Sequence, residues 1–188
     1  MRNLIYAINL TLDGCCDHTK GMADEELLDH YTQLLLDVDL LIYGRKTYQL
    51  MVPYWPDVAN NPSETKADRD FAKTFVSKNK VVFSRSLDSA QVKKEDTNAR
   101  VVRTDLRDEI LKLKNEPGKP ILVGGVDIPS QLTELGLVDE YRVVVAPVIA
   151  GKGRRLFDSV GLPQKLRLKL VETKTSKSGS VALRYVKQ

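Results

Sequence analysis

The stretch Leu40–Met51 has the sequence LLIYGRKTYQLM, and the organisation of the rest of the chain follows from it. An apolar run stops at Gly44, and two basic residues, a threonine and a helical pattern come after it. This order predicts a buried strand, a tight turn and the start of a helix. Free N–H groups and positive charge at such a start suit a phosphate group. The alternative is an ordinary strand-to-helix turn whose Arg45 and Lys46 face water.

Strands and helices are predicted to alternate along most of the chain. The predicted strands are residues 4–10, 40–43, 80–85, 99–103, 120–125 and 139–147. Helical spacing follows Asp24, Gly44, Thr65, Asp105 and Ile128, and Pro53 and Pro56 are expected to end the second of these helices. Alternating β and α elements favour a largely parallel sheet with helices on both faces.

The end of the chain follows a different pattern. Apolar and polar residues alternate over 165–170 and again over 181–185. We expect an antiparallel hairpin at the edge of the sheet, with one solvated face. The sequence shows no repeat and no linker, so residues 1–188 are predicted to form one α/β domain.

Composition excludes several classes of protein. The 188 residues are 42% apolar and 29% charged, which is typical of a globular chain. The net charge of +4 is dispersed, so nucleic acid is not expected as a partner. No run approaches the roughly 18 apolar residues of a membrane span. The adjacent Cys15 and Cys16 cannot staple a fold, so we expect reduced thiols and a cytoplasmic protein.

Three of the predicted strands end in similar chemistry. Gly44–Thr47 follows the second strand, Ser84–Ser86 the third, and Gly124–Gly125 the fifth. Ligands of open α/β sheets bind outside the carboxyl ends of the strands, so these segments should face one crevice. The glycines, hydroxyls and cations fit a ligand with several phosphates, and a dinucleotide with a 2′-phosphate would use the cations best. The usual Gly-x-Gly-x-x-Gly fingerprint and the P-loop pattern are both missing from the sequence.

The arrangement resembles the dihydrofolate reductase superfamily, and within it the reductase domain of the riboflavin-biosynthesis deaminase-reductase. The matching pieces are TLDG at 11–14, YGRKTY at 43–48, VFSR at 82–85, VGG at 123–125 and PVIAGKGRRLF at 147–157. The resemblance implies a three-layer sandwich, NADPH as the cofactor and a small heterocyclic substrate. Separately from the resemblance, the sheet edge and the terminal hairpin could pair with a second copy of the chain, so a homodimer is expected.

The resemblance assigns roles residue by residue. Gly44, Arg45, Lys46 and Thr47 match the turn on the cofactor phosphates, and Ser84 and Arg85 match the site of the 2′-phosphate. Gly124 and Gly125 match the glycine pair against the pyrophosphate, and Val126, Asp127 and Ile128 lead into the next helix. The segment Ala7–Asp13, including Asn9, would line the nicotinamide end.

The residues expected near the substrate differ from those of the folate enzymes, and each of them has two possible interpretations. Asp13 could bond a substrate amino group or hold a water for proton delivery, or it could belong to an Asp-Gly turn. Asp24 could reach the substrate or cap its helix. Trp55 could stack on the substrate or cover the edge of the core. Lys78 stands where the folate enzymes carry an arginine, which puts folate reduction in doubt.

A metal site is not expected. Cys15, Cys16 and His18 fall within four residues and lack the spacing of a zinc site. The favoured function is an NADPH-dependent reductase of a pterin-like or aminopyrimidine-like heterocycle, acting on a C=N or C=O bond. The rival is a non-catalytic or regulatory module that kept the nucleotide-binding fold.

Overall fold

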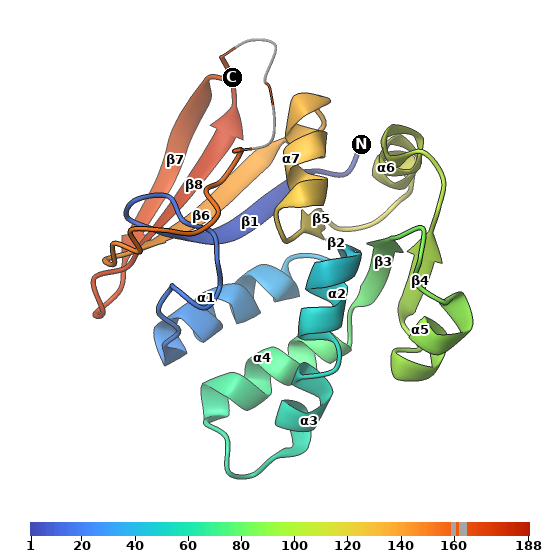
Figure 1. Cartoon of the computed structure of the whole chain (residues 1–188), viewed down its shortest axis with the longest axis horizontal. Coiled ribbons are helices and arrows are strands. Elements are labelled where there is room, and N and C mark those ends of the chain that lie inside the picture. Colours follow the sequence, from blue (N-terminus) through green and yellow to red (C-terminus); the bar gives the residue numbers. More distant parts are fainter. Residues whose placement is uncertain (159–160, 162–164) are drawn as a thin grey trace.

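The computed structural model describes residues 1–158, 161 and 165–188 and is shown in Figure 1. Its strands are β1 (Leu4–Thr11), β2 (Leu40–Gly44), β3 (Asn79–Phe83), β4 (Ala99–Val102), β5 (Ile121–Val123), β6 (Glu140–Ala146), β7 (Leu168–Thr175) and β8 (Val181–Lys187). Its helices are α1 (Glu25–Leu36), α2 (Arg45–Met51), α3 (Trp55–Asn60), α4 (Lys66–Val76), α5 (Ser89–Glu95), α6 (Leu106–Asn115) and α7 (Asp127–Glu134).

Within the described residues, the strands form one sheet in the order β4-β3-β2-β5-β1-β6-β8-β7. Strands β1 to β6 run parallel, and β8 pairs antiparallel with both β6 and β7. The predicted α/β class, the mostly parallel sheet and the C-terminal hairpin are therefore confirmed. The carboxyl ends of β3, β2, β5 and β1 lie next to one another, because these strands are neighbours in the sheet.

Helices cover both faces of the sheet, with α6 and α7 on one side and α1 to α4 on the other (Figure 1). Side chains of alternate residues of the strands enter two separate hydrophobic clusters, as a period of two requires. Ile5 and Leu41 pack with α1, α2, α4 and α5. Leu4 and Ile42 pack with α6 and α7. No helix of the described residues is long and apolar enough to cross a membrane.

Two local predictions need correction. Pro56 does not end a helix, because it lies in the first turn of α3, where a missing N–H costs nothing. Pro53 comes directly after Val52, the C-cap of α2, so it is the proline at the end of that helix. The sequence patterns also do not predict helix α5, although Asp88 caps it by accepting hydrogen bonds from the N–H groups of Ala90 and Gln91.

The hairpin forms at the predicted place, but β7 does not have one buried face. Leu170 is 48% exposed and Val171 is 44% exposed, and every residue of β7 after Leu168 is exposed. The register between β7 and β8 shifts between Leu170 and Glu172. The irregularity interrupts the period of two on which the prediction relies.

Candidate functional site

The three segments with similar chemistry lie side by side at the carboxyl edge of the sheet. Gly44 ends β2 and is the N-cap of α2, and Ser84 follows β3 and donates its N–H to the carbonyl of Val102 at 3.1 Å. Gly124 follows β5 and donates its N–H to the carbonyl of Ile42 at 3.1 Å. Because β3 pairs with β2 and β2 with β5, the predicted crevice is formed by adjacent strand ends.

The glycines of this edge are packed too closely for a side chain. A Cβ atom on Gly125 would lie 2.3 Å from Oγ1 of Thr47, and Gly125 has a φ of +89°. A Cβ on Gly124 would lie 2.9 Å from the ring of Tyr43. Gly44 lies against Ile128 of α7, whose Cγ1 would be 3.2 Å from its Cβ. The turn after β5 and the start of α2 therefore form one tightly packed, backbone-lined surface.

Cations surround this surface. Arg45 donates a hydrogen bond from Nη1 to the hydroxyl of Ser86 at 2.8 Å, which connects the start of α2 to the segment after β3. Arg45, Lys46 and Arg85 are all exposed. Among the described residues, no carboxylate lies within ion-pair distance of these three side chains. The edge offers positive charge to a ligand in solution.

The turn after Phe83 is held by the hydroxyl of Ser84. This oxygen accepts the N–H groups of Ser86 at 3.3 Å and of Leu87 at 3.1 Å. The segment that carries Arg85 is thereby fixed next to Arg45. The hydroxyl proton of Ser84 stays available to an acceptor, because both of these bonds use its lone pairs.

The helix after the glycine pair begins without a side-chain cap. Val126 is the N-cap of α7 and makes no side-chain capping hydrogen bond. The turn before it is tied to β1, because Tyr6 donates its hydroxyl to the carbonyl of Gly125 at 3.0 Å. Sequence reasoning does not single out Tyr6, since a tyrosine inside an apolar strand gives no sign of a partner so far along the chain.

Asp13, at the end of β1, is held by several donors. Its carboxylate accepts the hydroxyl of Thr11 at 2.6 Å and the N–H groups of Ala150 and Gly151, each at 3.0 Å. Arg155 Nη2 lies 3.4 Å from it. The hydrogen bonds from Thr11 and then from the 150–151 backbone hold the pKa of Asp13 well below its usual range. Asp13 is therefore an ionised carboxylate that fixes the segment after β6.

That segment, residues 147–158, lies against the turn that follows β1. Leu12 donates its N–H to the carbonyl of Val148 at 2.8 Å, and Cys16 donates to the carbonyl of Arg154 at 2.9 Å. Cys15 and Cys16 are free thiols. A Cβ on Gly153 would lie 2.6 Å from Sγ of Cys15, so glycine is required at this crossing. The 147–158 segment is thus attached along its length to the end of β1.

Comparisons with known proteins agree with this architecture. Residues 2–182 match the RibD C-terminal domain. The chain belongs to the RibD C-terminal domain family. The predicted resemblance to the riboflavin reductases, and through them to the dihydrofolate reductase-like fold, is therefore confirmed.

The chain is also similar to individual proteins. It is 35% identical over 188 residues to the uncharacterized protein YyaP of Bacillus subtilis (strain 168), covering 98% of this chain and 94% of that protein. A putative riboflavin biosynthesis protein from Shewanella sp. PV-4 superposes with a TM-score of 0.73 at 18% identity, over 100% of this chain and 99% of that one.

A larger protein contains the same fold as one part. The diaminohydroxyphosphoribosylaminopyrimidine deaminase/5-amino-6-(5-phosphoribosylamino)uracil reductase of Thermotoga maritima superposes with a TM-score of 0.68 at 17% identity. The match covers 100% of this chain and 57% of that protein. At such identities the two solved structures show a shared fold.

Asp24 and Asn9 are two of the residues that the sequence predicts to meet the substrate. Asp24 caps α1, because Oδ1 accepts the N–H of Leu27 at 2.7 Å, as the capping interpretation predicted. Asn9 accepts the hydroxyl of Tyr31 at 2.7 Å. Beside them is a hollow of about 440 Å³, lined by Asp24, Leu27 and Val144 among others. Val144 is the register partner of Asn9, so the hollow adjoins the end of β1.

Trp55 packs as the core interpretation predicted. Its ring meets the ring of Phe71 edge to face at 4.5 Å and contacts the cluster of Val58, Ala59 and Ala72. Lys78 donates from Nζ to the carbonyl of Val38 at 3.0 Å. Lys78 therefore supports the backbone just after α1.

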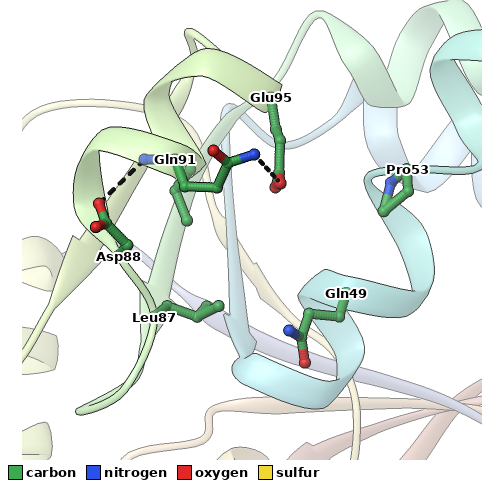
Figure 2. Close-up of a pocket in the computed structure, with 7 residues that line it drawn as sticks. Gln49, Pro53, Leu87, Asp88, Gln91 and Glu95 are labelled. Atoms are coloured by element: carbon green, nitrogen blue, oxygen red, sulfur yellow. Dashed lines mark hydrogen bonds between the residues drawn. The ribbon is translucent and has the colours of Figure 1, made fainter.

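Another hollow, of about 340 Å³, opens between α2 and α5 and is shown in Figure 2. Its lining comprises Gln49, Pro53, Leu87, Asp88, Gln91, Val92 and Glu95. Gln91 donates to Glu95 at 2.8 Å across its wall. Leu87 follows directly on Ser84–Ser86. This hollow therefore lies next to the cationic edge, by which we mean the carboxyl edge of the sheet that carries Arg45, Lys46 and Arg85. Sequence reasoning misses it because the sequence patterns do not predict α5, which forms one wall.

Proposed function

We propose that this RibD C-terminal domain protein is an NADPH-dependent reductase of a small nitrogen heterocycle, of the aminopyrimidine or pterin class. One observation carries the proposal: three neighbouring strand ends bring to one edge glycine-lined backbone and three cations that pair with no carboxylate of the described residues. A dinucleotide phosphate needs close backbone approach and positive charge together. The family membership favours a reductase over a nucleotide-binding module without a reaction.

The residues present fit NADPH. The glycines at 44, 124 and 125 are only partly buried, and without Cβ atoms their turns pack closely against one another while part of their backbone stays accessible to a ligand. We assign the pyrophosphate to this surface, with Lys46 and Thr47 on one side and Val126 and Ile128 at the start of α7 on the other. When bound, NADPH would supply the hydride for the reduction.

The 2′-phosphate is assigned to the segment after β3. Arg45 donates a hydrogen bond to Ser86, which is next to Arg85 in the chain. The segment therefore has two arginines near it, and a guanidinium group can bind a phosphate through two parallel hydrogen bonds. Ser84 has a hydroxyl proton to donate. Because NADH lacks this phosphate, these residues predict a preference for NADPH.

At the substrate end we propose roles for Asn9 and Asp13. The lowered pKa keeps Asp13 ionised at neutral pH, so its part would be to hold a water or a substrate amino group rather than to give its own proton. Asn9 would orient the heterocycle through the amide that Tyr31 fixes. Asp24 and Trp55 each have a structural partner in the protein. A contact of either side chain with the substrate therefore stays a prediction.

We also propose that the protein is a homodimer in which the hairpin contributes to the interface. Strand β7 is at the end of the strand order, and its exposed Leu170 and Val171 would be covered by a second copy. The measurement is the mass in solution of the wild type and of Leu170→Lys. A monomeric wild type would remove the dimer and leave the reductase proposal untouched.

The reductase proposal is tested in two steps. The first is a titration with NADPH and with NADH, followed by melting temperature, because a ligand that binds only the folded state raises stability. Selective stabilisation by NADPH is expected. The second is oxidation of bound NADPH in the presence of aminouracils and dihydropterins. Binding without oxidation by any of these would favour the non-catalytic module, and no binding of either nucleotide would overturn the proposal.

A further inference from the structure

Asp127, the first residue of α7, is a carboxylate among cations. Arg154 Nη2 donates to its Oδ1 at 2.6 Å, and both side chains are substantially exposed. The Arg154 hydrogen bond lowers the pKa of Asp127, and the charge of Lys46 acts in the same direction. Asp127 is therefore paired with a cation of the 147–158 segment and is also influenced by the charge of a cation of α2.

This carboxylate stands at the edge that we assign to the cofactor phosphates. Asp127 comes two residues after Gly125, whose turn packs against Thr47, the neighbour of Lys46. A negative charge here opposes an anionic ligand unless a cation compensates for it. In the structure, Arg154 provides that compensation.

Arg154 belongs to a segment that reaches the other end of the site. Its carbonyl accepts the N–H of Cys16, and its neighbour Arg155 lies 3.4 Å from the carboxylate of Asp13. The backbone N–H groups of Ala150 and Gly151 bind the same carboxylate. A side chain anchored at the substrate end is thus positioned at the start of α7.

We propose that Arg154 binds the pyrophosphate of the dinucleotide and that Asp127 is its displaceable counter-ion. The inference rests on the proposed function and adds a residue to it. The Arg154–Asp127 pair is exposed, and an exposed ion pair contributes little stability. A diphosphate offers the same guanidinium more charge and a bidentate geometry. Arg154 therefore exchanges Asp127 for the cofactor when the cofactor binds.

The proposal predicts that removing the two partners of one ion pair has opposite effects on binding. Arg154→Ala removes a phosphate ligand and raises the Kd for NADPH about tenfold. Arg154→Lys, which keeps the charge, restores part of the loss. Asp127→Asn removes the competing carboxylate and lowers the Kd about threefold. Asp127→Asn breaks one exposed ion pair, so it should lower the melting temperature of the free protein only slightly.

The experiment is fluorescence titration of NADPH into the wild type and these variants, with Lys152→Ala as the matched control. Lys152 is an exposed cation of the same segment and makes no side-chain hydrogen bond or ion pair within the described residues. Its variant should bind like the wild type. Equal weakening by Arg154→Ala and Asp127→Asn would overturn the inference and make the pair purely structural. If the wild-type protein binds no NADPH, the proposed function itself is refuted.

Discussion

Replacing Gly125 by alanine is expected to destabilise the protein by about 2–5 kcal/mol, as the sum of two separable costs. The first is conformational: Gly125 has a φ of +89°, and an L-residue held at positive φ costs about 1–2 kcal/mol. The second is steric: the new Cβ would lie 2.3 Å from Oγ1 of Thr47, and relieving such an overlap costs about 1–3 kcal/mol.

A second substitution separates the two costs. Thr47→Ala removes Oγ1, after which the nearest remaining atom of residue 47 is its own Cβ, 3.4 Å from the new methyl group. In the double variant the steric cost should vanish and the conformational cost of about 1–2 kcal/mol should stay. Thr47→Val is the control, because its branched side chain keeps an atom where Oγ1 was and should give no rescue.

The assay is urea unfolding of the wild type, the single variants and both double variants, analysed as double-mutant cycles. A coupling of at least about 1 kcal/mol is expected with Thr47→Ala and none with Thr47→Val. If Gly125→Ala costs less than about 1 kcal/mol, or if both double variants behave alike, the close packing of the glycine turn against α2 is refuted.

Three further predictions address binding and buried charge. Arg85→Ala should weaken NADPH by about 1–3 kcal/mol more than NADH in a fluorescence titration; equal losses would mean that Arg85 does not contact the 2′-phosphate. Burial tends to raise the pKa of Glu140, but hydrogen bonds from Arg184 and a second arginine outweigh it and lower the pKa overall. The stabilisation from Glu140 is therefore present above the ordinary glutamate pKa and is lost as the pH falls through the pKa of the folded protein. The difference in unfolding free energy between the wild type and Glu140→Gln should therefore shrink in acid. A difference that grows in acid would contradict this prediction. Lys80 is fully buried and its Nζ lies 2.9 Å from the largely buried carboxylate of Asp96. Asp96→Asn should cost about 3–5 kcal/mol in urea unfolding, because it leaves the buried ammonium without its charged partner, while Lys80→Met combined with Asp96→Asn should cost much less. Equal costs would mean that burial of an unpaired charge is not the cause.

The strand ends are predictable from the sequence because each carries a local signal. An apolar run that stops at Gly44 or at Gly124 sets both the end of the strand and the start of the next helix, and it needs no distant partner to be recognised. The cap at Asp24 is equally local. Because the cationic edge is built from such strand ends, local signals are sufficient to predict it.

The parts that escape prediction depend on contacts between distant segments. No residue near Asp13 in the sequence indicates that its carboxylate accepts hydrogen bonds from the backbone of Ala150 and Gly151. The pairing of Arg154 with Asp127 has the same character, because both residues are surface-like in sequence and meet only through the fold. The exposure of Leu170 depends on what covers β7, the last strand of the sheet, and a period of two in the sequence cannot reveal that.

The position of β1 in the sheet has a consequence for how the chain folds. Its neighbours are β5 and β6, with Leu4 paired to Ile121 and Ile5 to Glu140, whereas β2, β3 and β4 find each other in sequence order. During synthesis the first strand therefore stays without hydrogen-bonding partners until most of the chain has emerged. Contacts of such long sequence separation slow folding. We expect β2 to β4 to assemble first, and the first strand to dock last, completing the glycine-lined edge and the end of β1 in one late step.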